Sequence, residues 1–124
     1  MTNTFLKIIK LLLLTMFILS SEIVFSQSYH TSSKKAVNCF KKAHQEFLNE
    51  SYEEALALTD KALDKDGDFI DAVLLKAEIC LELNADSSAI ASYERVLELD
   101  SMFYPRCSMT LSKLYAEHFR FDES

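Results

Sequence analysis

Residues 36–69 align with residues 70–103 when the sequence is shifted by 34 positions. The matches fall mainly at small and apolar positions, and so many matches at one shift are hard to obtain by chance. A fixed period of this length is typical of a solenoid, in which each unit buries its apolar face against its neighbours. The matched pairs are Ala43 with Ala77, Ala55 with Ala89, Leu56 with Ile90, Lys61 with Arg95, Ala62 with Val96, Leu63 with Leu97, Asp66 with Asp100, and Phe69 with Phe103.

Apolar side chains inside each unit recur at helical spacing, so that they fall largely on one side of a helix. The whole chain contains one Gly and one Pro. That is too few for the turns of a sheet-rich fold or for a Gly-rich phosphate-binding loop. The sequence therefore predicts an all-α fold. The helical runs are Tyr52, Ala55, Leu56, Leu58, Ala62 and Leu63; Val73, Leu74, Ala77, Cys80 and Leu81; and Ala89, Ile90, Tyr93, Val96 and Leu97.

Several residues mark expected helix ends. Asp86, Ser87 and Ser88 predict a helix start, because short polar side chains accept hydrogen bonds from free backbone N–H groups. Gly67 predicts a helix stop in the left-handed conformation that glycine adopts without steric cost. Pro105 predicts the start of a further helix, which suits its restricted φ angle.

The repeating unit resembles the tetratricopeptide repeat over residues 36–118. That family has a 34-residue pattern of two antiparallel helices that touch through small residues. The resemblance implies an α-solenoid with a first repeat at 36–69, a second at 70–103 and the first helix of a partial third repeat at 104–124. The residues that match the helix-packing positions are Ala43, Ala55, Ala62, Ala77, Ala89, Tyr93 and Val96.

The resemblance also implies where a partner would bind. In tetratricopeptide arrays the first helices of the repeats line a concave groove that holds a peptide or a partner helix. Here this face is apolar and acidic, which suits an amphipathic or basic segment. Its aromatic residues have an alternative interpretation as simple packing against a neighbouring helix. The residues that the resemblance places on the concave face are Phe40, His44, Phe47, Leu74, Glu78, Leu81 and Tyr115.

One subclass of the family grips a partner's C-terminal carboxylate with Lys, Asn and Arg side chains on these helices. Phe40, His44, Leu74 and Glu78 occupy the corresponding positions in this sequence. The residues therefore argue against a carboxylate clamp.

The N-terminus has the tripartite pattern of a secretory signal peptide. Lys7 and Lys10 precede the apolar run 11–19, and a cleavage site follows Ser26. We expect residues 1–26 to be a signal peptide, residues 27–35 to be a short linker, and the protein to reach the periplasm or cell envelope. The alternative is an uncleaved membrane anchor, although the apolar stretch is shorter than the roughly 20 residues that a spanning helix needs.

Residue chemistry excludes several functions. A net charge of −6 argues against nucleic acid as a partner. The Asp-rich stretch 64–68 lacks the ligand spacing of a calcium loop, and Cys39, Cys80 and Cys107 form no zinc motif, so we expect no cofactor or metal. We expect the three cysteines to be small buried thiols, with a disulfide or an intermolecular bridge as the alternative. No nucleophile elbow or acid–base pair indicates an enzyme.

The sequence thus predicts a non-enzymatic interaction scaffold of the cell envelope. The alternative is the N-terminal repeat segment of a larger envelope protein, with propeller or peptidoglycan-binding domains, that docks or forms homo-oligomers through its open last helix.

Overall fold

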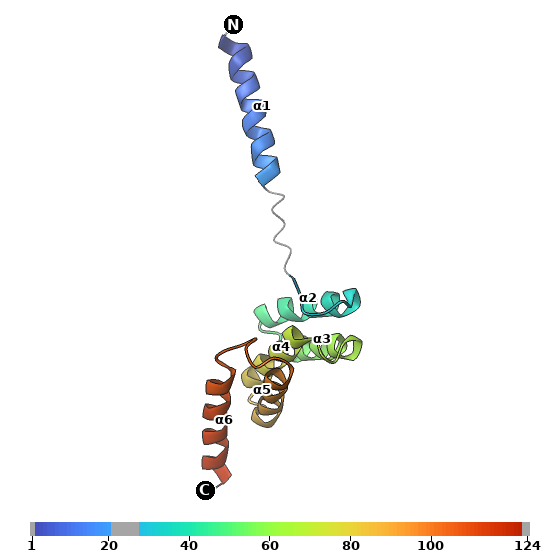
Figure 1. Cartoon of the computed structure of the whole chain (residues 1–124), viewed down its shortest axis with the longest axis vertical. Coiled ribbons are helices and arrows are strands. Elements are labelled where there is room, and N and C mark those ends of the chain that lie inside the picture. The colour runs from blue at the N-terminus through green and yellow to red at the C-terminus, as the bar shows by residue number, and fades with distance from the viewer. Residues whose placement is uncertain (1, 21–27, 123–124) are drawn as a thin grey trace.

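The computed structural model describes residues 2–20 and 28–122, and these residues form α-helices joined by short turns (Figure 1). The all-α prediction is confirmed, and from residue 34 onward consecutive helices pack as adjacent antiparallel pairs. In chain order the helices are α1 (Thr2–Ser20), α2 (Lys34–Leu48), α3 (Tyr52–Lys65), α4 (Ile70–Glu82), α5 (Asp86–Leu99) and α6 (Cys107–Asp122).

Helix starts differ in how they are capped. The Ser33 hydroxyl accepts a hydrogen bond from the Ala36 N–H at 3.2 Å, and this side-chain cap starts α2. α5 begins at Asp86 as expected, but the predicted capping role of its polar residues is wrong. Ala85 occupies the N-cap, and no side chain accepts a hydrogen bond there. Asp86 instead lies in the first turn, where its negative charge favours the helix dipole.

The first helix of each pair ends through the same backbone motif. Glu50 and Asn84, which are one repeat apart, have φ angles of 62° and 56°. Ser51 N–H then donates to the Glu46 carbonyl at 2.9 Å, and Ala85 N–H donates to the Cys80 carbonyl at 2.8 Å. A left-handed residue directly after a helix lets the chain turn back and satisfies the helix's last carbonyls.

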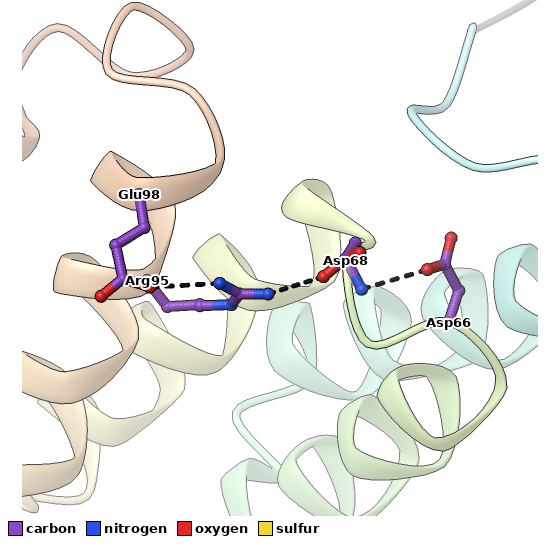
Figure 2. Close-up of polar contacts among 4 residues, drawn as sticks. All are labelled: Asp66, Asp68, Arg95 and Glu98. Carbon is purple, nitrogen blue, oxygen red and sulfur yellow. Dashed lines mark hydrogen bonds and ion pairs between the residues drawn. The ribbon is translucent and has the colours of Figure 1, made fainter.

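The second helix of each pair ends differently, and here the prediction for Gly67 is wrong. Gly67 has no positive φ angle. The chain leaves α3 through Asp66 in an extended conformation, and the Asp66 carboxylate accepts the Asp68 N–H at 3.0 Å (Figure 2). Asp100 repeats this turn after α5, accepting the Met102 N–H at 2.9 Å. A side-chain turn of this kind replaces a left-handed glycine.

Small residues bring the helices together. α2 pairs with α3 and α4 pairs with α5, while α3–α4 and α5–α6 contacts join successive pairs. Alanine at a contact position allows two helix axes to approach closely. The seven residues that the sequence placed at packing positions are all buried: Ala43, Ala55, Ala62, Ala77, Ala89, Tyr93 and Val96.

The thiols are free in this structure. Cys80 and Cys107 are buried and Cys39 is half-buried. Burial raises the pKa of both the Cys80 and the Cys107 thiol. The Cys107 thiol also donates to the Tyr93 carbonyl at 3.3 Å, so it serves as a buried contact between α5 and α6.

α1 stands apart from the other helices (Figure 1). No other helix in the described ranges packs against it. Within residues 2–20 and 28–122, no helix combines the length and apolar character needed to cross a membrane. The predicted cleavage site after Ser26 lies outside the described residues.

Candidate functional site

The candidate site is a wall made by α2 and α4, which we call the α2–α4 wall. It comprises six of the residues that the sequence placed on the concave face. From α2 come Phe40, His44 and Phe47, and from α4 come Leu74, Glu78 and Leu81.

The α2 side of the wall is aromatic. Phe40 is half-buried, with its ring stacked on His44 at 6.1 Å between centroids and tilted against Phe69 at 5.2 Å. Phe47 is half-buried against Tyr52 at 5.7 Å. Phe40 and Phe47 also pack on the core between the first two helix pairs. Both therefore contribute to helix packing while keeping part of their surface accessible.

The α4 side is apolar and acidic. Leu74 and Leu81 are half-buried along the core that α4 shares with α5 and α6. Glu78 lies between these two leucines on α4. Burial raises the pKa of its carboxyl, and the nearby charge of His44 lowers that pKa by a smaller amount. Direct contacts between α2 and α4 place the two sides of the wall next to each other. A partly desolvated carboxylate interacts strongly with an incoming cation.

Tyr115 on α6 is less clearly part of this surface. Its hydroxyl donates a hydrogen bond to the Glu94 carboxylate on α5. α6 contacts α5, and its buried residues share one core cluster with residues of α4 and α5, on which Tyr115 also packs. The position of Tyr115 on a third wall stays a prediction.

The expected linker at 27–35 differs in the structure. Lys34 and Lys35 already belong to α2. Residues 28–33, which we call the N-terminal segment, contact the repeats. Tyr29 packs on Phe40, and His30 reaches Asp71 at the start of α4. Sequence reasoning missed these residues, and the one available signal was an aromatic residue four positions before the Ser33 cap.

Ion pairs brace the turns beside the wall. Arg95 on α5 donates to Asp68 at 2.6 Å and to Glu98 at 3.1 Å, so it ties α5 to the turn before α4 (Figure 2). Lys76 on α4 donates to Asp60 on α3 at 2.8 Å. Each exposed pair contributes about 0–1 kcal/mol.

A cavity of about 290 Å³ lies among α3, α4 and α5. Lys76 and Arg95 line it, but both cations are engaged by the carboxylates of Asp60 and Asp68. The cavity therefore offers no unneutralised cation to an anionic ligand. No group of three His, Cys, Asp or Glu side chains converges as a metal site in the part of the chain that the structure describes.

Comparison with known proteins gives one family. A tetratricopeptide repeat profile matches residues 46–114. No curated protein matches the sequence. Among solved structures, the chain is similar to the first tetratricopeptide repeat domain of Spaghetti (RPAP3) bound to the HSP90 peptide SRMEEVD. That match has 19% sequence identity and a TM-score of 0.38, and it covers 73% of this chain and 98% of that chain.

Proposed function

This chain belongs to the tetratricopeptide repeat family, and from that premise we propose that it is a non-enzymatic scaffold that binds a partner peptide or helix through the α2–α4 wall. Domains of this family are generally protein–protein interaction modules and typically lack catalysis. The wall supports this proposal because it combines accessible apolar surface with a carboxylate.

The observation that carries the proposal is the half-buried Glu78 between Leu74 and Leu81. Apolar side chains supply the burial that drives association, while a partly desolvated acid selects a cation. The partner that fits is an amphipathic segment with a basic residue. Phe40 and Phe47 extend the apolar surface onto α2.

The test is capture of the partner from the native host by tagged protein, with cross-linking and identification by mass spectrometry. Glu78→Lys reverses the charge in the wall, whereas the control Glu54→Lys reverses an exposed charge on α3. We expect Glu78→Lys to lose the cross-linked partner and Glu54→Lys to retain it, with equal helicity by circular dichroism. Retention of the same partner by Glu78→Lys would refute the proposal.

Export is a second part of the proposal. Phe5, Leu11, Leu13 and Leu14 are among the apolar side chains of α1 that are exposed. Such a helix fits a signal sequence better than a folded repeat. We expect the protein recovered from the envelope fraction to begin at Gln27, as measured by intact mass. Recovery with residues 1–26 attached would favour the membrane-anchor alternative.

One observation favours docking through the last helix as an alternative function. Met109 and Phe119 on α6 are 72% and 62% exposed. Exposed apolar side chains on an outer helix of a solenoid are the type of surface that a further domain or a second copy covers. Light scattering of purified protein over a range of concentrations tests self-association. A monomer at all concentrations would exclude the homo-oligomer.

A further inference from the structure

We infer that the N-terminal segment, residues 28–33, occupies the Phe40 end of the α2–α4 wall and the adjoining residues Phe69 and Asp71, and that the partner replacing it there presents the same chemistry. That chemistry is an extended segment with an aromatic side chain followed directly by a hydrogen-bond donor. The inference rests on the proposed function, because it names what the proposed wall binds.

The aromatic part of the segment is Tyr29. Its ring meets Phe40 edge-on at 5.5 Å between centroids and Phe69 edge-on at 6.3 Å. The Lys41 ammonium lies 5.8 Å from the centre of the same ring. Edge-to-face contacts of this kind orient an aromatic ring as well as burying it. Phe40 and Phe69 therefore form a receptor surface for one aromatic side chain.

The polar part of the segment is His30. Its backbone N–H donates to Asp71 Oδ2 at 3.0 Å, and its Nδ1 lies 3.1 Å from the same oxygen. The Asp71 side chain is 19% exposed, and that of His30 is 57% exposed. Asp71 is thus a largely covered acceptor that faces an accessible donor. The imidazole ring also lies perpendicular to the ring of Phe103, which follows α5 in the sequence, with 5.0 Å between the ring centroids.

Thr31 completes the contact by donating its hydroxyl to Asp66 at 2.5 Å. The hydrogen-bond partners of His30 and Thr31 lie 41 and 35 residues away. The segment therefore makes tertiary contacts, whereas a simple linker would contact only residues close to it in the sequence. It spans α2, the turn before α4 and the turn before α6.

The tether sets the strength of this self-occupancy. Ser33 is the N-cap of α2, so Tyr29 is tethered to the start of this helix by a link of four residues. A short tether gives an effective concentration of the order of millimolar. A partner in solution must compete with this concentration, so its apparent affinity for the wild-type protein falls.

The test uses protein beginning at Gln27, which keeps every described contact between helices because α1 makes none. The probe is a synthetic peptide with the sequence of residues 28–34. Binding is followed by NMR shifts of the Phe40 and Asp71 amides, up to about 5 mM peptide. We compare the wild type with Tyr29→Ala/His30→Ala and with the control Ser32→Ala, whose side chain is exposed.

We expect the double variant to bind the peptide at least about tenfold more tightly than the wild type, since the competing tether is removed. The control variant should match the wild type, and a peptide with Ala in place of its Tyr and His should not bind. Equal binding by the wild type and the double variant would show that the segment does not occupy the wall. Absence of binding by the double variant would show that the wall does not take this chemistry.

These outcomes are separable from failure of the proposed function. The proposed function depends on whether Glu78→Lys loses the cross-linked partner, which requires no peptide. A partner that is lost by Glu78→Lys, but captured equally by the wild type and by Tyr29→Ala/His30→Ala, would overturn this inference alone.

Discussion

Ile79 on α4 joins the first helix pair to the second, and its removal should show how strongly the pairs depend on each other. Its side chain is 0% exposed and packs in one cluster with Ala43, Ala55 and Leu75. Ile79→Ala removes three carbon groups, each contributing about 0.8 kcal/mol. The cavity left among residues that relax only partly adds about 1 kcal/mol. We therefore expect a loss of about 3–4 kcal/mol in the free energy of unfolding.

Urea denaturation followed by far-UV circular dichroism measures this loss directly. For a domain of this size the corresponding fall in Tm is about 12–30 °C. The matched control is Leu48→Ala, which removes the same number of carbons from a side chain that is 61% exposed. Its expected cost is below about 0.5 kcal/mol. A cost for Ile79→Ala within about 1 kcal/mol of the control would refute the reasoning that this contact couples the two pairs.

Three further predictions follow from individual side chains. Burial raises the pKa of Glu78, so its neutral form favours the fold, and this contribution is lost as pH rises through the folded pKa. Wild type and Glu78→Gln should therefore have equal Tm values well below pH 4.5 and diverge above it, with Gln more stable; a constant difference would contradict this. Glu50 has a φ angle of 62°, so Glu50→Gly should raise the unfolding free energy by about 0.5–1 kcal/mol in urea denaturation, whereas Glu50→Ala should not. Cys39 should react first with a thiol reagent in the native protein, and Cys80 and Cys107 only after unfolding, because burial covers them and raises the pKa of both thiols; equal rates for all three would contradict the buried placement.

The helix pairs could be read from the sequence because their determinants are local and repeated. Ala55 and Ala89 lie one period apart and are both buried. A residue's size and its helical spacing are visible without knowing what it contacts. Helix ends were less predictable, because a left-handed position depends on backbone geometry. The structure places it at Glu50 and Asn84, while Gly67 has no positive φ.

The site residues divide in the same way. The resemblance to the tetratricopeptide repeat put Phe40 and Leu74 on first helices, and both lie on α2 and α4, half-buried. The hydroxyl of Tyr115, by contrast, is directed to Glu94, and no pattern in the sequence pairs these two residues. The hydrogen-bond partner of Tyr115 depends on how close α6 lies to each earlier helix, and the sequence does not give those distances.

The sequence by itself determined the helical class, the period and the small residues that let helices touch, since each follows from residue size and spacing along one helix. Only the tertiary structure decided that His30 meets Asp71, 41 residues away, and that Glu78 is the desolvated acid of the wall. Both depend on distances between segments that are remote in the chain. Those distances are set by the angles at which successive helices pack.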